Sequence, residues 1–216
     1  MKERESDEKS HFDCRVFARC TLVFCAGGLN DGLVNWWAGN GNAVDTIGGD
    51  NGVLQSGVTF TNGVAGQAFS FDGSSGFVST PLLVNNPQTF SLSLWFKTAT
   101  TQGGVLLGFG DTQTGNSPNY DRNIYLDNSG LIHFGVWTGS AQLINSAVAY
   151  NDWHQVVGSI SANTGLSLYM DGALLGNNPA VTNAQIYNGY WRIGENTLAI
   201  SGVPWPFLPS SFYFNG

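Results

Sequence analysis

The sequence has few charged residues, and residues that favour helices are nearly missing from most of it. Charged side chains make up 11% of the 216 residues, under half of the roughly 25% usual for soluble proteins. After Lys9 the only lysine is Lys97, and after Glu8 the only glutamate is Glu195. Because these two residue types fill the exposed positions of most helices, their scarcity argues against a helical fold. The net charge of −7 argues against nucleic acid as a partner, since an acidic surface repels phosphates.

Cysteine is lacking after the first 27 residues, and these residues differ from the remainder. They hold a stretch in which acids balance bases, followed by a short apolar run. A secretory signal has a positive start and a longer apolar run, so we interpret residues 1–27 as a leader that is disordered or outside the fold. His11, Cys14, Cys20 and Cys25 are spaced more loosely than structural zinc ligands, which favours free thiols. Residues 28–216 then form one domain without disulfides, and no apolar stretch reaches the about 20 residues of a transmembrane segment.

Glycine and aromatic residues are abundant, with 29 Gly, 14 Phe and 7 Trp. Residues 88–98 (QTFSLSLWFKT) alternate between apolar and other side chains, as a strand with one buried face does. Similar short segments are separated by clusters of Gly, Asn, Asp and Ser. They predict strands over 123–127, 131–137, 142–146, 153–160, 166–171 and 173–176, and two more within 66–80. The pattern predicts an all-β, two-sheet antiparallel β-sandwich.

Five segments of the chain resemble, in order, the laminin-G-like jellyroll domains of the concanavalin A-like lectin and glucanase group. They are GLVNWWAGNGNAVDTIGGDNGVL (32–54), VAGQAFSFDGSSGFV (64–78), FSLSLWFKT (90–98), NDWHQVVGSI (151–160) and LSLYMDGALLG (166–176). The resemblance implies a concanavalin A-like jellyroll and an extracellular or cell-surface module for adhesion or carbohydrate binding, sometimes with calcium. In that family a strand of the form G-x-I-D-E-V-x-I-Y follows the position of Phe212–Gly216. We therefore expect a sandwich whose C-terminal strand is missing and whose exposed edge is prone to strand-mediated association.

Catalytic patterns are missing from residues 28–216. The resemblance implies that β-glucan-cleaving enzymes of this fold carry E-x-D-x-x-E, and glycosidases generally need two carboxyl groups on either side of the scissile bond. Glu195 is the single glutamate of this region, so that pair is not available. His133 and His154 lie within predicted strands, and no G-x-S-x-G elbow is present. We predict that the chain is not an enzyme, with glycoside hydrolysis a less favoured alternative.

A loop at residues 40–52 (NGNAVDTIGGDNG) is the candidate metal site. Asp45, Asp50 and Asn51 offer the hard oxygen ligands that Ca²⁺ prefers, and the resemblance implies that a calcium site often sits there. Calcium is therefore the one cofactor predicted. The competing interpretation is a turn held by its own Asx hydrogen bonds.

Candidate ligand-binding residues are aromatic side chains that alternation places away from the core, together with a polar loop. Trp95 shares its predicted face with serines and Lys97, and a flat ring can stack on a sugar. The loop 110–123 supplies Tyr120, Asp121 and Arg122 as further contacts. The segment 200–209 (ISGVPWPFLP) is either a partner patch or a loop that covers a sheet. The predicted partner is a glycan; a structural or protein-interaction module of a larger surface protein is the alternative.

Overall fold

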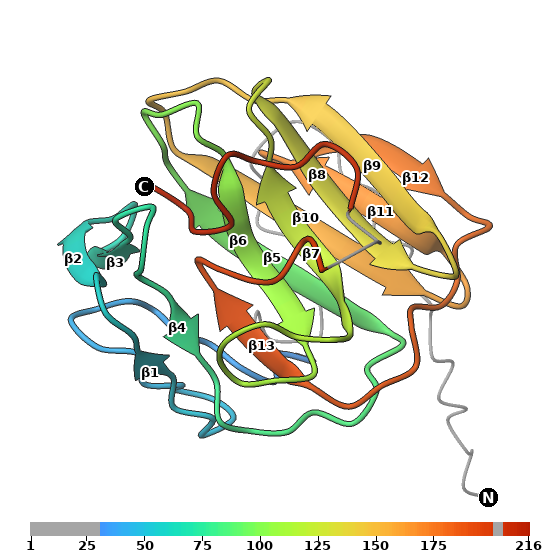
Figure 1. Cartoon of the computed structure of the whole chain (residues 1–216), viewed down its shortest axis with the longest axis horizontal. Helices are drawn as coiled ribbons and strands as arrows, with labels where there is room; N and C mark the ends of the chain where they lie inside the picture. Colours follow the sequence, from blue (N-terminus) through green and yellow to red (C-terminus); the bar gives the residue numbers. More distant parts are fainter. Residues whose placement is uncertain (1–30, 201–204) are drawn as a thin grey trace, which may run out of the picture. The chain divides into compact units, whose positions relative to one another are not determined.

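The computed structural model describes residues 31–200 and 205–216, and within these ranges it contains strands and loops but no helix (Figure 1). The chain divides after Val34 into two units, and every strand belongs to the second. The predictions for residues 1–27, including Cys14, Cys20 and Cys25, fall outside the described residues. The strands are β1 (Val53–Leu54), β2 (Thr59–Asn62), β3 (Gln67–Ser70), β4 (Val78–Ser79), β5 (Phe90–Phe96), β6 (Gly104–Gly110), β7 (Tyr120–Leu126), β8 (Leu131–Trp137), β9 (Ala141–Ala147), β10 (His154–Ser161), β11 (Gly165–Met170), β12 (Ala173–Asn178) and β13 (Tyr190–Ile193).

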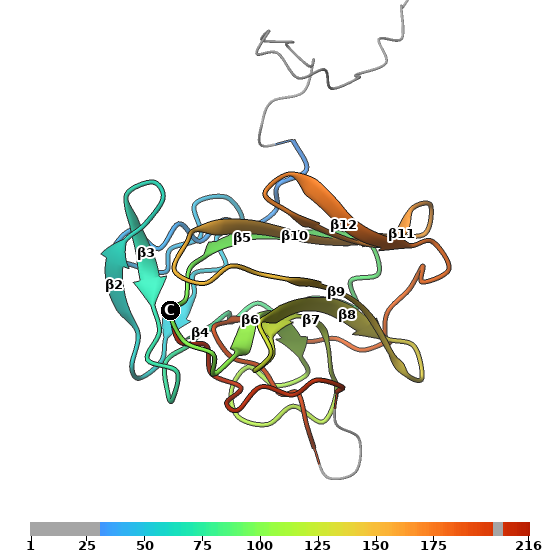
Figure 2. The same ribbon diagram turned by 90° about the horizontal axis from the view of Figure 1, so that it is seen from above.

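Two antiparallel sheets stack face to face (Figure 2). The seven-stranded sheet has the order β1-β4-β13-β6-β7-β8-β9, and the four-stranded sheet has the order β12-β11-β10-β5. A separate hairpin, β2-β3, completes the set. The predicted two-sheet antiparallel β-sandwich is confirmed.

The main hydrophobic core lies between the two sheets and follows the alternation of each strand. On β5, Leu92 and Phe96 are buried and Phe90 and Leu94 pack against the same core, while Ser91, Ser93 and Trp95 are exposed. From the other sheet, Ile124, Ile132 and Phe134 are fully buried in this core. Gly158 on β10 leaves room for the Phe134 ring, because a Cβ there would lie 2.7 Å from it.

A second cluster covers the opposite face of the seven-stranded sheet. Val105, Tyr120, Tyr125, Leu198 and Trp205 are buried together there. Figure 2 shows the chain after β13 running along this side of β6, β7 and β8, away from the four-stranded sheet. All seven residues of both β6 and β7 are buried as a result. The interpretation of segment 200–209 as a covering loop fits the position of residues 205–209.

The last residues of the chain also pair with the body of the fold. Tyr213 forms a parallel bridge with Val105, and Asn215 forms an antiparallel bridge with Asp72. Phe71 and Gly216 exchange two backbone hydrogen bonds. β5 is one of the two edge strands of the four-stranded sheet, with β10 as its ladder partner. The association expected through an exposed strand edge stays a prediction.

Candidate functional site

An aromatic recess lies on the covered face of the seven-stranded sheet. Its lining residues are Pro118, Tyr120, Trp137, Gln185 and Trp205, and its volume is about 200 Å³. We call this feature the aromatic recess. Tyr120 begins β7, Trp137 ends β8, and the other three come from connecting segments. Three aromatic rings and one amide side chain therefore meet at a single opening.

The lack of a side chain at Gly135 leaves room for Trp205 on the sheet. It lies on β8 two residues before Trp137, and a Cβ there would lie 3.0 Å from Cζ3 of Trp205 and would overlap Leu143. The Trp205 indole N–H reaches the carbonyl of Tyr120 at 3.4 Å, and its backbone N–H donates to Leu198 O at 2.8 Å. Because the sheet has no side chain at position 135, the indole can pack directly on the backbone.

Asp121 and Arg122 lie in the interior directly behind the aromatic recess. Both are 0% exposed and form an ion pair with each other. The direct ligand contact predicted for these two residues therefore needs correction, because neither side chain reaches the surface. The β6–β7 ladder shifts register next to them, and Arg122 has a positive φ of 55°. This irregularity turns the guanidinium inward, over the rings of Phe109 and Tyr187 at 5.0 and 5.1 Å.

The buried pair positions two walls of the recess. Asp121 Oδ2 accepts hydrogen bonds from the backbone N–H groups of Trp137 and Gln185, both at 3.1 Å. Arg122 donates to the carbonyl of Gln185 at 2.8 Å and to that of Pro87 at 3.0 Å. Burial raises the pKa of the Asp121 carboxyl, and Arg122 opposes that effect. The two predicted residues are thus positioning residues for the recess.

A second buried pair anchors the loop that carries Pro118. Arg192 contacts Glu195 at 3.0 Å and donates to Thr112 O at 2.6 Å. The loop is also tied by Ser117, whose backbone N–H donates to Thr197 Oγ1 at 2.9 Å. Glu195, the single glutamate after the leader, therefore pairs with the arginine that holds this loop.

Trp95 lies on the other sheet, away from the aromatic recess. It is 49% exposed on β5, and its partner across the ladder is Gln155 of β10. The alternation argument thus placed this ring correctly on an outer face. Tyr120, in contrast, is buried in the second cluster and lines the recess. The structure brings Tyr120, Asp121 and Arg122 together and leaves Trp95 separate from them.

The predicted calcium loop is organised around the Asp45 carboxylate. Its two oxygens accept from five nitrogen donors at 2.7–3.1 Å: Asn35 Nδ2 and the backbone N–H groups of Trp36, Ile47, Gly48 and Asp50. Burial acts to raise the pKa of Asp45, but these donors hold that pKa well below its usual range. Asn51 Oδ1 accepts the backbone N–H of Asp45 at 3.0 Å. The loop therefore closes on itself by Asx-type hydrogen bonds.

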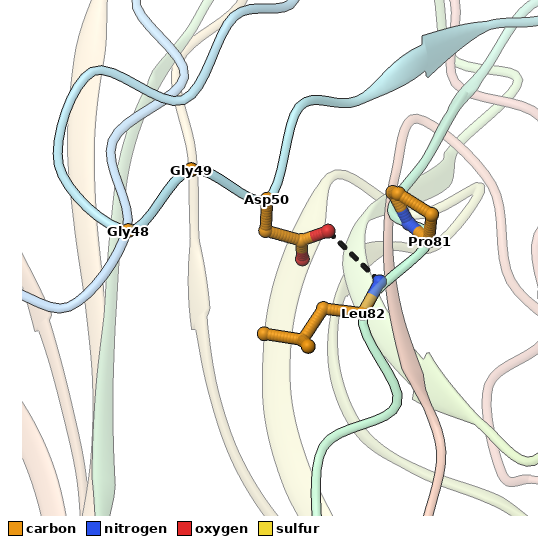
Figure 3. A pocket seen from close by; sticks show the side chains of 5 residues that line it. All are labelled: Gly48, Gly49, Asp50, Pro81 and Leu82. Atoms are coloured by element: carbon orange, nitrogen blue, oxygen red, sulfur yellow. Dashed lines mark hydrogen bonds between the residues drawn. The ribbon is translucent and has the colours of Figure 1, made fainter.

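Asp50 faces an open depression lined by Gly48, Gly49, Pro81 and Leu82, with a volume of about 300 Å³ (Figure 3). Its Oδ1 accepts the backbone N–H of Leu82 at 2.8 Å, and burial raises the pKa of its carboxyl. No group of three or more His, Cys, Asp or Glu side chains comes together as metal ligands in the part of the chain that the structure describes. With the Asp45 oxygens occupied by N–H donors, this donor set does not fit Ca²⁺, which favours the competing interpretation of a turn held by its own hydrogen bonds over the predicted calcium site.

Comparison with known proteins places the chain in a family. A family model described as the concanavalin A-like lectin/glucanases superfamily (Laminin_G_3) matches residues 72–208. The chain belongs to this superfamily. The match spans both buried pairs, most of both sheets and all five residues that line the aromatic recess. The concanavalin A-like assignment made from the sequence is confirmed. No curated protein matches the chain in sequence.

Solved structures share the concanavalin A-like fold at low sequence identity. Domain 4 of AbnA, an extracellular arabinanase from Geobacillus stearothermophilus in complex with arabinotriose, has a TM-score of 0.53 at 17% identity, over 82% of this chain and 85% of that chain. The binding domain of Botulinum neurotoxin DC, in complex with rat synaptotagmin II, has a TM-score of 0.55 at 17% identity, over 77% and 44%. The binding domain of Paraclostridial Mosquitocidal Protein 1 has 0.51 at 12%, over 68% and 39%. The matched region spans less than half of the two toxin domains, and the likeness shows the fold.

Sequence reasoning missed Trp137 and Gln185, and it covered Pro118 and Trp205 only as members of the candidate segments 110–123 and 200–209. Trp137 ends a predicted strand, and Gln185 lies in a segment without a pattern, so neither had a local signal. A usable signal did exist for Asp121 and Arg122. In a region with three cationic residues, an Arg directly after an Asp suggests a specific pair, because charges are rarely fully buried unless paired. In the described part of the chain, no helix is long and apolar enough to cross a membrane.

Proposed function

We propose that this chain is a non-catalytic carbohydrate-binding module that takes an uncharged sugar ring in the aromatic recess. The observation that carries the proposal is the meeting of Tyr120, Trp137 and Trp205 at one opening beside the amide of Gln185. Sugar rings present C–H faces that stack on aromatic rings, and their hydroxyl groups need a small number of fixed polar partners.

The polar side of the recess is held in a defined orientation. Gln185 Nε2 donates to Asn119 Oδ1 at 2.8 Å, and Asn119 is itself fixed by Asp111 Oδ2 at 2.7 Å. With one of its two N–H donors engaged, the Gln185 amide keeps Oε1 as an acceptor and its second N–H as a donor for a ligand hydroxyl. The backbone of Gln185 is fixed by Asp121 and Arg122. Preorganised polar groups of this kind reduce the entropy lost on binding.

Charge and size narrow the ligand class. Arg122 and Arg192 are fully buried and paired with acids, so neither is available to bind an anionic sugar. The recess of about 200 Å³ is smaller than the roughly 300–1,000 Å³ of sites that enclose drug-sized ligands. One uncharged ring is the ligand that these properties favour. The similar arabinanase domain is in complex with arabinotriose, which is also an uncharged sugar.

The absence of catalysis is part of the proposal. The recess presents an amide and aromatic rings, and Asp121, the carboxylate that accepts the backbone N–H groups of Trp137 and Gln185, is buried and paired. Glycoside hydrolysis needs an acid and a second carboxylate that both reach the bond. An extracellular location is proposed on the same basis, since the arabinanase that contains the similar domain is extracellular.

The test is binding to a panel of neutral and acidic glycans, followed by calorimetry on any sugar that binds. Trp137→Ala removes a half-buried ring of the recess, and Trp95→Ala removes an exposed ring from the other sheet. We expect Trp137→Ala to weaken binding by at least about 1 kcal/mol, or about fivefold, as for a contact residue. Trp95→Ala is the matched control and should bind like the unchanged chain.

Two outcomes would contradict this proposal. One is binding that is lost in Trp95→Ala and kept in Trp137→Ala, which would place the site on the four-stranded sheet. The other is hydrolysis of a bound oligosaccharide by pure protein, which would contradict the non-catalytic assignment. Running the panel with added calcium and with chelator tests the calcium prediction at the same time.

A second candidate function is protein interaction through the outer face of the four-stranded sheet. Trp95 and Leu174, which are 49% and 56% exposed, lie on the edge strands of that sheet, β5 and β12. Exposed apolar residues on a sheet face favour a protein partner when they form a patch. No glycan binding on the panel, together with partner binding that Trp95→Ala abolishes, would favour this alternative.

A further inference from the structure

His133 is enclosed between two aromatic rings on the covered face of the seven-stranded sheet. It lies on β8 and is 0% exposed. The ring of Tyr125 stacks on one side at 4.7 Å with an interplanar angle of 15°, and Phe207 stacks at 5.2 Å with an angle of 13°. Tyr125 belongs to the sheet, whereas Phe207 belongs to the segment 205–210, which we call the strap. His133 is therefore a direct contact between the sheet and the strap.

The hydrogen bonds of His133 suit the neutral ring. Its Nε2 lies 3.0 Å from Asp127 Oδ2, and its buried Nδ1 has no hydrogen-bond partner among the described residues. Because a carboxylate only accepts, Nε2 carries the proton and Nδ1 is left with a lone pair. A second proton would create a buried N–H donor at Nδ1 without an acceptor, and such a group is costly. The packing thus favours one protonation state.

The strap connects this histidine to the aromatic recess. Tyr125 Oη donates to Pro206 O at 2.6 Å, which fixes the strap beside Phe207. Trp205, the first residue of the strap, is 1% exposed and lines the recess. Phe207 has a positive φ of 57°, a strained backbone conformation for a residue with a side chain. Contacts such as the one with His133 must hold that conformation in place.

The titratable groups that face His133 come from each neighbouring element. Asp127 lies in the β7–β8 turn, Tyr125 lies on β7, and Tyr150 lies beyond β9 and interacts electrostatically with Asp127. The residue opposite on β9 is Asn145, which is uncharged. Burial works against ionisation of Asp127, but the hydrogen bonds from His133, Leu131 and Ser129 lower its pKa. Burial raises the pKa of both tyrosines, so neither tyrosine changes its charge in acid, and His133 is the group beside Asp127 that can take up a proton there.

We propose that His133 makes docking of the strap dependent on pH. The strap stays on the sheet while the imidazole is neutral, and it leaves when the ring takes a second proton and needs water at Nδ1. Because Trp205 moves with the strap, the aromatic recess loses one wall in acid. That last step rests on the proposed function of the recess, while movement of the strap does not.

The direction of the effect follows from linkage. Burial lowers the pKa of His133 below its ordinary value of 6.5 in the docked state, in spite of Asp127. A ring that is exposed to water recovers that ordinary value. Protonation therefore does not oppose docking above pH 6.5. Below that pH, the equilibrium constant for docking falls by up to about tenfold per pH unit, until the pKa of the docked state is reached.

The experiment is ¹⁹F NMR of the full chain labelled with 5-fluorotryptophan, titrated from neutral to mildly acidic pH without any sugar. The Trp205 signal is assigned from a Trp205→Phe sample. We expect this signal to change with a midpoint below pH 6.5, in step with the ring protons of His133. His133→Gln keeps a neutral N–H near the position of Nε2 and cannot titrate, so its Trp205 signal should stay constant.

Two further variants make the test complete. His154→Gln removes the other histidine of the described region, which pairs with Asp171 on the other sheet, and it should leave the Trp205 titration unchanged. Phe207→Ala opens one face of His133 and should raise the midpoint of the ring titration toward 6.5. A Trp205 signal that does not change with pH, or that titrates equally in His133→Gln, would overturn the proposal. A titrating strap in a chain that binds no sugar would contradict only the proposed function.

Discussion

Replacing Arg122 with methionine tests whether the buried pair beside the recess works as a unit. The variant keeps an unbranched side chain over Phe109 and Tyr187 but removes the guanidinium. Asp121 then stays buried without its cation, and the carbonyls of Pro87 and Gln185 each lose a donor. Breaking a buried ion pair by removing one partner costs about 3–5 kcal/mol. For a protein of this size that is a fall of roughly 6–20 °C in Tm.

The measurements are thermal melting and urea unfolding followed by tryptophan fluorescence. The companion variant is Asp121→Asn/Arg122→Met, which removes both charges and leaves an amide that still accepts the N–H groups of Trp137 and Gln185. We expect the double variant to recover at least about 1 kcal/mol relative to the sum of the single variants, because the pair interacts directly. Simple additivity of the two changes, or a loss under about 1 kcal/mol in Arg122→Met, would refute the reasoning.

The Arg122→Met variant should also acquire a characteristic pH dependence. Burial already acts to raise the pKa of Asp121, and without Arg122 no cation opposes that effect. A carboxyl whose pKa is raised by folding contributes stability at low pH and loses it as pH rises through the folded-state pKa. The deficit of the variant relative to the unchanged chain should therefore be smaller in acid than at neutral pH.

Three other changes have clear expected outcomes. Gly135→Ala places a Cβ 3.0 Å from the Trp205 indole and 2.5 Å from Gln142 O, so urea unfolding should show a loss of about 1–3 kcal/mol from overpacking; a loss under about 0.5 kcal/mol would mean that the indole does not sit on the backbone there. Folding lowers the pKa of Asp45 below the ordinary 3.8, so the unchanged chain should lose stability as pH falls below about 4, and Asp45→Asn should lose less over the same range. Because the Asp45 oxygens of loop 40–52 already accept hydrogen bonds, we expect added calcium to leave Tm unchanged, whereas a bound ion would raise Tm.

The alternating strands could be predicted because each has one buried face. β8 was predicted with its observed bounds, and β5 and β10 within two residues. β6 was not predicted, since GVLLGFG is buried on both faces and therefore shows no alternation. A period-two pattern appears only when one face of a strand is buried and the other is exposed, and both faces of β6 are buried.

The candidate site was harder to predict than the fold for a related reason. Asp121 and Arg122 looked like surface residues because they are charged and follow a polar stretch. Their burial depends on a register shift against β6 and on Tyr187, which is 65 residues further along the chain than Arg122. Trp205 reaches the recess because of an empty position at Gly135. Neither of these long-range contacts can be predicted from the residues that are adjacent in the sequence.

The docking of residues 205–214 on the sheet also determines when the aromatic recess forms. The walls of the recess come from segments near residues 118, 137, 185 and 205, so the opening forms only after the segment that holds Trp205 has been synthesised and has docked. A chain in which Trp205 has not docked would have an incomplete recess. Under the proposed function, capture of a sugar would then require that Trp205 has already docked on the sheet.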